Sequence, residues 1–265
     1  MRILIFGDVV AKPGRRALAS VLPRWKELHS PDFVIANVEN LAHGVGATEK
    51  TLGELREAGV HCFTSGNHIW DKHARALLED PIGALLRPAN YPPSNPGVGE
   101  KVFTVNGRKI LVVNLLGRVF FRESADCPFR AADAILERTV LGKDADIILV
   151  DFHAEATSEK VALGFYLDGR VTALFGTHTH VPTADQTTLA NGTAYITDVG
   201  MTGLKDSVIG ADKASVIQMF LTQTPARTMH DAAESGAVFV NAMLLEVNDA
   251  GAVTLWQRLQ ETVEV

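Results

Sequence analysis

The first third of the chain alternates between short apolar runs and amphipathic helical patterns. Three continuous apolar runs predict strands buried on both faces, at residues 2–6, 33–36 and 60–64. The first helical pattern opens at Lys12-Pro13-Gly14, where a proline in the first turn costs little. The second begins after Thr48 as N-cap and ends at Gly59. Strands that recur with a helix between them are typical of βαβ units.

The rest of the chain continues this alternation and adds two hairpins. Asn106-Gly107 is a strong turn signal between apolar runs at 101–105 and 109–115. A proline-rich stretch, 88–99, predicts a long surface loop near a site. The other expected elements are a helix around 130–141, strands at 147–150, 171–176 and 193–197, and a closing hairpin from 236–246 and 252–260. We therefore expect one α/β domain over residues 1–265, with a mixed sheet or two stacked sheets.

Composition excludes several classes of protein. Hydrophobic residues make up 46% and charged residues 21%, as in globular proteins. The net charge of −6 argues against a basic surface for stable nucleic-acid binding. No apolar run approaches a membrane span, and the run at 3–6 is too short for a secretory leader. Cys62 and Cys127 form no metal or disulfide pattern. The expectation is a cytoplasmic protein with no disulfide and no membrane segment.

Polar residues follow the apolar strands at five places. These are Gly7-Asp8, Glu39-Asn40, Asn67-His68, Asp151 to His153, and His178-Thr179-His180. In α/β sheets, ligand sites form beyond the carboxyl ends of the strands. We therefore expect these side chains to converge on one crevice.

Their chemistry points to metal ions. His178 and His180 lie two residues apart, so that in an extended chain both imidazoles face the same side. The donors are oxygen and nitrogen only, which favours a catalytic site for Mn, Fe or Zn over a structural thiolate site. The candidates exceed the needs of one tetrahedral ion, whereas a two-metal site with a bridging carboxylate uses them all. They are Asp8, Glu39, Asn40, Asn67, His153, His178 and His180.

These blocks resemble those of the calcineurin-like metallophosphoesterases, and specifically the bacterial YmdB-like phosphodiesterases. The most specific are Gly-Asn-His at 66–68 and Gly-Thr-His-Thr-His at 176–180. The chain departs from the common superfamily pattern in having Val10 instead of histidine, and Val-Glu-Asn at 38–40 instead of a G-D-x-x-D block. The YmdB-like branch shares these departures, so they sharpen the resemblance.

The resemblance implies a four-layer α-β-β-α sandwich with two mixed β-sheets. It also implies two transition-metal ions, Fe or Mn foremost, with Zn as the alternative. Asp8, Asn40 and His180 would hold one ion. Asn67, His153 and His178 would hold the other, and Glu39 would bridge them.

The implied reaction is phosphodiester hydrolysis, with 2′,3′-cyclic nucleotides as the foremost substrates and phosphomonoesters as a side reaction. Two cations lower the pKa of a shared water and orient the phosphate for in-line attack. The leaving alkoxide needs a proton. His68 follows ligand Asn67 and is not required to bind metal, so we predict it as general acid, the role of the equivalent histidine in the family. The expected partner is a small phosphodiester or nucleotide; a homo-oligomer is left open.

A different class of function also fits a metal site. The protein could be a regulatory or RNA-processing partner whose site is structural or barely active, although an intact His68 argues against this. Secondary candidates keep two interpretations each. His43 is expected either to contact the substrate or to order the glycine-containing loop around it. Asp151 and Glu155 are expected either to hydrogen-bond a ligand imidazole or to be solvated. Arg118 and Arg122 clamp phosphate or are simply exposed. His29, His61, His73 and His230 are expected to be structural or at the surface.

Overall fold

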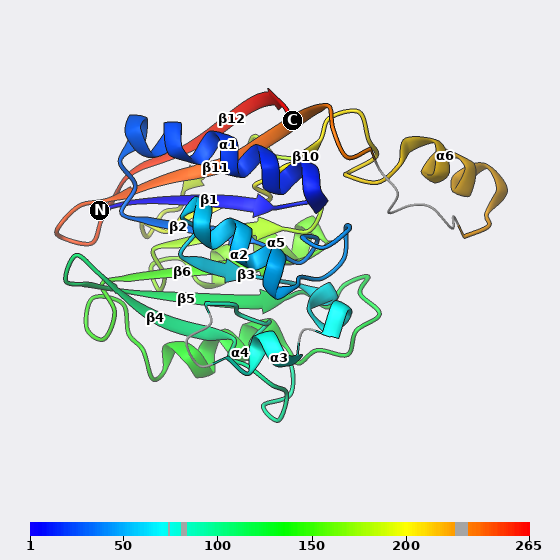
Figure 1. Cartoon of the computed structure of the whole chain (residues 1–265). Helices are drawn as coiled ribbons and strands as arrows, with labels where there is room; N and C mark the ends of the chain where they lie inside the picture. The colour runs from blue at the N-terminus through cyan, green and yellow to red at the C-terminus, as the bar shows by residue number, and fades with distance from the viewer. Residues whose placement is uncertain (74, 81–83, 226–232) are drawn as a thin grey trace.

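Two mixed β-sheets stack face to face in the computed structural model, with helices on their outer faces (Figure 1). The structure describes residues 1–73, 75–80, 84–225 and 233–265. The predicted four-layer α/β architecture is confirmed.

The first sheet carries the N-terminal βαβ units. Its strand order is β10 (Gly203–Leu204), β11 (Ala237–Val247), β1 (Arg2–Asp8), β2 (Phe33–Asn37) and β3 (Cys62–Thr64), with β12 (Val253–Glu264) also paired to β11. Strands β1, β2 and β3 run parallel, whereas β11 is antiparallel to β1, β10 and β12. Its outer face is covered by α1 (Ala11–His29) and α2 (Glu49–Ala58). Helix α2 has the predicted Thr48 N-cap and ends at Gly59 in the left-handed conformation.

The second sheet has the order β4 (Glu100–Val105), β5 (Arg108–Leu116), β6 (Ile147–His153), β7 (Ala173–Thr177), β9 (Ala194–Ile196) and β8 (Thr187–Thr188). Strands β5, β6, β7 and β9 run parallel, and the predicted hairpin joins β4 to β5. Packing on the outer face comes from α4 (Pro128–Leu136) and α5 (Thr157–Tyr166). The remaining elements are η1 (Asn67–His73), α3 (Arg75–Leu78) and α6 (Lys213–Thr222).

Continuous apolar strands arise because each strand is buried from both sides. In β1, Ile3 and Ile5 belong to the core between the sheets, while Leu4 and Phe6 belong to the core under α1 and α2. Successive side chains of a strand point to opposite faces, so an alternating pattern would leave one face polar. The polar residues are therefore displaced to the strand ends, where the site lies.

Some predicted elements differ from the observed ones. Helix α4 ends at Leu136, short of the expected 141, and neither α5 nor α6 was predicted. The 88–99 segment, predicted as a surface loop, is partly buried. Its Asn90 is buried, and Asn90 Nδ2 donates to the carbonyls of Leu116 and Asp126 at 2.7 and 2.8 Å. Cys62 and Cys127 are free thiols. Among the described residues, no helix combines the length and the apolar character that crossing a membrane requires.

Candidate metal centre

The labelled parallel strands β1, β5 and β6 end on the same side of the molecule (Figure 1), and the predicted site residues lie at or just after the ends of β1, β2, β3, β6 and β7. Strand β1 ends at Asp8 and β6 at His153, both fully buried. The others follow β2, β3 and β7 within a few residues, at Glu39, Asn40, Asn67, His178 and His180. Stacking of the sheets brings these ends together, as expected for a ligand site in an α/β fold.

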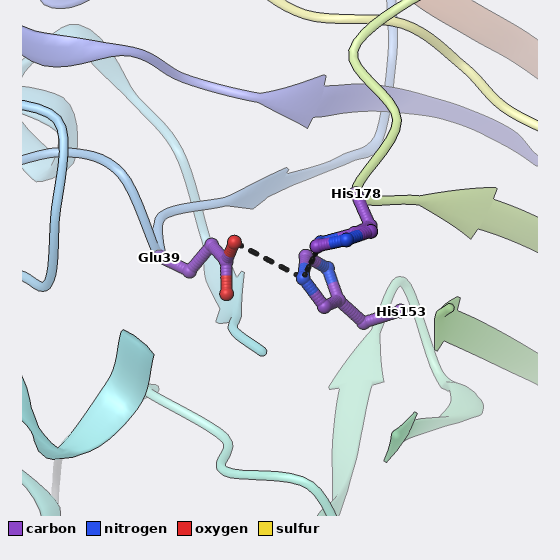
Figure 2. A group of neighbouring side chains, drawn as sticks. All are labelled: Glu39, His153 and His178. Atoms are coloured by element: carbon purple, nitrogen blue, oxygen red, sulfur yellow. Dashed lines mark hydrogen bonds and ion pairs between the residues drawn. The ribbon is translucent and has the colours of Figure 1, made fainter. Parts of the chain in front are cut away.

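The first group of ligand-type atoms centres on His153. Its Nε2 lies 3.0 Å from Glu39 Oε1 and 3.0 Å from His178 Nδ1, so that the histidine stands between the other two side chains (Figure 2). Ligand atoms of these three residues all lie within 4.8 Å of one another. The spacing is that of side chains that could share one ion.

The outer ring nitrogens of His153 and His178 make hydrogen bonds that determine which nitrogen of each ring carries the proton. The Thr177 hydroxyl donates to Asp151 Oδ1 at 2.7 Å, so it accepts from His153 Nδ1 at 2.9 Å. Likewise His178 Nε2 donates to Glu155 Oε2 at 3.0 Å. In neutral rings, both inward nitrogens then carry lone pairs. Two lone pairs and a carboxylate oxygen then converge, and a positive charge between them, a proton on His153 or a bound cation, satisfies that arrangement.

The electrostatics also favour positive charge at this point. Burial, together with the neighbouring His153, lowers the pKa of His178 to about 3, so its imidazole is neutral near pH 7. Burial opposes ionisation of Glu39, but the charge and hydrogen bond of His153 outweigh it and set the pKa of Glu39 at about 2. Burial likewise disfavours a charged His153, but Glu39 and Asp8 raise its pKa to about 9. The carboxylates thus require a positive charge here, from a proton on His153 or from a bound cation.

A second group of acceptors centres on His180. Its Nδ1 donates to the carbonyl of Ile209 at 2.7 Å, which leaves Nε2 as an acceptor 3.2 Å from Asn40 Oδ1. The amide of Asn40 donates to the carbonyl of Gly44 at 2.9 Å, so its oxygen faces His180. Asp8 Oδ1 lies 3.9 Å from His180 Nε2, is buried, and has no hydrogen-bond partner among the described residues. Three acceptors from the described part of the chain again converge without a donor.

Two local features complete the geometry. Asn67 Oδ1 is buried and has no hydrogen-bond partner within the described ranges, as expected of an amide oxygen that binds an ion. Gly66 precedes it, and a Cβ there would lie 2.2 Å from both Glu39 Oε2 and His153 Cδ2. Only glycine lets the backbone approach these two side chains so closely.

His68 lies at the edge of the site. Its side chain is 36% exposed, and its backbone N–H donates to Glu39 Oε2 at 3.3 Å. Asp71 Oδ2 lies 2.9 Å from His68 Nδ1 and holds that nitrogen. Nε2 is therefore the ring nitrogen left to exchange a proton. Asp71 was not among the predicted residues, and because its backbone is non-helical, with a ψ of 162°, no helical spacing indicated this contact.

The structure decides between several of the open interpretations. The solvated interpretation of Asp151 was wrong: it is fully buried and acts on His153 through Thr177. Glu155 contacts His178 directly, and Arg118 and Arg122 are exposed. His43 lies beside the site in a cavity described below. Of the histidines expected to be structural, His61 Nδ1 accepts from the backbone N–H of Val34 at 2.9 Å, and His230 lies outside the described residues.

Comparison with known proteins identifies the family. The model of the YmdB-like proteins matches residues 4–259. The chain belongs to the YmdB-like family. A curated relative, the 2′,3′-cyclic-nucleotide 2′-phosphodiesterase of Bacillus subtilis (strain 168), is 44% identical over 249 residues, which cover 94% of this chain and 92% of that protein. The resemblance expected from the sequence motifs is thus confirmed.

Two solved structures of high similarity share the fold. A hypothetical protein from Thermus thermophilus superposes with a TM-score of 0.91 at 44% identity, covering 99% of both chains. A novel phosphatase from Mycoplasma pneumoniae gives a TM-score of 0.91 at 35% identity, over 100% of this chain and 94% of that one. The four-layer architecture is therefore common to these relatives.

Proposed function

We propose that this YmdB-like protein is a metal-dependent phosphoesterase that hydrolyses phosphodiesters, with 2′,3′-cyclic nucleotides as its substrates. The observation that carries the proposal is the presence of two adjacent groups of ligand-type nitrogen and oxygen atoms, around His153 and around His180, whose carboxylates require positive charge. The name of the Bacillus subtilis relative supports the substrate class, because the similarity extends over nearly the whole of both chains.

Each group would hold one transition-metal ion. Asp8, Asn40 and His180 would bind the first, and Asn67, His153 and His178 the second. Glu39 would bridge the two. Oxygen and nitrogen donors suit Fe or Mn, with Zn as the alternative. When bound, such ions lower the pKa of water and neutralise phosphate oxygens.

Neighbouring side chains orient these ligands, and one of them would protonate the leaving group. Thr177 and Asp151 fix the tautomer of His153, while Glu155 fixes that of His178. With Nδ1 held by Asp71, His68 would deliver a proton from Nε2 to the departing oxygen. A ribose alkoxide is a poor leaving group and depends strongly on this proton.

Turnover of 2′,3′-cyclic AMP and of bis-p-nitrophenyl phosphate tests the proposal. Protein stripped with EDTA should be inactive on both esters, and stoichiometric Mn²⁺ should restore activity on both. Isothermal titration confirms that the metal has bound. Protein that binds Mn²⁺ but hydrolyses neither ester would contradict the proposal and favour the regulatory or RNA-processing alternative.

A further inference from the structure

A cavity of about 530 Å³ opens directly beside the candidate metal centre. Asn40, His68 and His180 are among the residues that line it. Asn40 and His180 are proposed metal ligands, and His68 is the proposed general acid. Whatever occupies the cavity is therefore in reach of a phosphate bound at the centre, and its volume suits a small organic ligand.

Much of the cavity's lining is apolar. It comes from α6 and the segment before it, through Val208, Val216, Met219 and Phe220. Few polar groups interrupt it: His43, and the ion pair that Lys12 Nζ forms with Glu234 Oε2 at 2.6 Å. An apolar slot with a few polar groups at its rim is the usual lining of a site for a planar heterocycle.

The cavity also gives a role to helix α6, which contributes almost nothing to the hydrophobic core. Helix α6 stands away from the two sheets (Figure 1), and of its residues, all of which the structure describes, Val216 alone is buried. Phe220 is 74% exposed although it lines the cavity. Leu221, the next residue, is 76% exposed and does not line it. An exposed aromatic ring at the mouth of such a cavity offers a face on which a base can stack.

We infer that this cavity binds the nucleoside part of the substrate, with the base stacked on Phe220. The inference rests on the proposed function and extends it to a specificity site. The phosphate would then lie beside Asn40 and His180, and Lys12 and Glu234 would face the base edge with one donor and one acceptor group. Stacking depends little on base identity, because every base has a π-face. The enzyme should accordingly accept several 2′,3′-cyclic nucleotides with similar efficiency.

The test compares two esters that differ only in the base. One is 2′,3′-cyclic AMP; the other is the 2′,3′-cyclic phosphate of 1-O-methylribose, which has the same leaving group and no base. Phe220→Ala should raise KM for the nucleotide by about 5- to 150-fold, the equivalent of about 1–3 kcal/mol of stacking per base. Its kcat for the nucleotide should change little, and the abasic ester should lose far less. Leu221→Ala is the matched control and should resemble the wild type on both esters.

The outcomes separate the inference from the function on which it rests. Equal losses of Phe220→Ala on both esters, or an equal effect of Leu221→Ala, would overturn the nucleoside site while leaving the phosphoesterase intact. A wild-type enzyme that hydrolyses neither ester in the presence of Mn²⁺ would overturn the proposed function, and the nucleoside site with it.

Discussion

Lys160 Nζ lies 2.7 Å from Asp198 Oδ2, and both side chains are fully buried behind the loop that carries His178 and His180. The same carboxylate oxygen accepts hydrogen bonds from the backbone N–H and the hydroxyl of Thr179, at 3.1 and 2.8 Å. His178 and His180 have φ values of 99° and 66°, in the left-handed region that costs a non-glycine residue about 1–3 kcal/mol. The ion pair therefore anchors a strained loop from its centre.

Loss of one partner of this pair should be severe. Asp198→Ala leaves the Lys160 ammonium buried without compensation, which should lower the free energy of unfolding by about 3–5 kcal/mol. Urea denaturation of the metal-free protein measures it. Adding Lys160→Met to Asp198→Ala should recover part of the loss, because no unpaired charge then remains buried. Strictly additive losses in the two single variants and the double variant would contradict the assignment.

Because the proposed ligands form two groups, we expect substitution of one histidine to remove one metal ion and leave the other bound. His178→Ala should bind only the ion on the Asp8 side, and His180→Ala only the ion on the His153 side. Glu39→Ala should weaken both, because its carboxylate would bridge them. Elemental analysis after gel filtration should give about one ion per chain for each histidine variant and fewer for Glu39→Ala. His29→Ala, distant from the site, serves as the control with about two ions. Retention of two ions with full activity in Glu39→Ala would exclude a bridge.

A general acid and a metal ligand respond differently to the leaving group. His68→Ala should keep its metals but lose about 10²–10⁴-fold in kcat on 2′,3′-cyclic AMP. It should lose much less on bis-p-nitrophenyl phosphate, because p-nitrophenolate leaves without protonation. Asp71→Asn should show the same preference with a smaller loss. Measuring kcat and metal content together decides the role: an equal loss on both esters, or loss of an ion, would make His68 a ligand or a scaffold.

Gly66 and Gly53 provide a matched pair of glycine-to-alanine changes. Gly66→Ala places a Cβ 2.2 Å from Glu39 Oε2, so Glu39 or His153 must move, and metal binding should weaken by about 10- to 100-fold. Gly53 lies inside α2 with no described atom within 4 Å of a Cβ, so Gly53→Ala should raise the free energy of unfolding by about 0.5–1 kcal/mol. Metal titration and thermal unfolding check both, and wild-type metal affinity in Gly66→Ala would be inconsistent with the geometry.

Local sequence patterns predicted the longer strands of both sheets, but not the two-residue strands β8 and β10. Runs such as Ile3 to Phe6 are apolar because both faces are buried, and the ordered polar residues after them follow from that packing. Helix α6 escaped prediction because its apolar positions do not form a buried stripe: Ile217, Phe220 and Leu221 are exposed.

Contacts between distant strands could not be predicted in the same way. Thr177 supports His153 only because β6 and β7 pair with those two residues opposite each other. The Lys160–Asp198 pair joins α5 to the segment after β9, 38 residues away. Such contacts depend on strand register and on how the elements pack, and neither can be predicted from the hydrophobic periodicity of one sequence.

The most direct measurement of the central claim is an anomalous difference map from crystals grown with Mn²⁺. The account predicts two peaks per chain, about 3.5–4 Å apart, on either side of Glu39. One should lie within coordination distance of His153 Nε2 and His178 Nδ1, and the other within coordination distance of His180 Nε2. A single peak, or peaks away from these nitrogens in a crystal of active enzyme, would contradict the two-metal site.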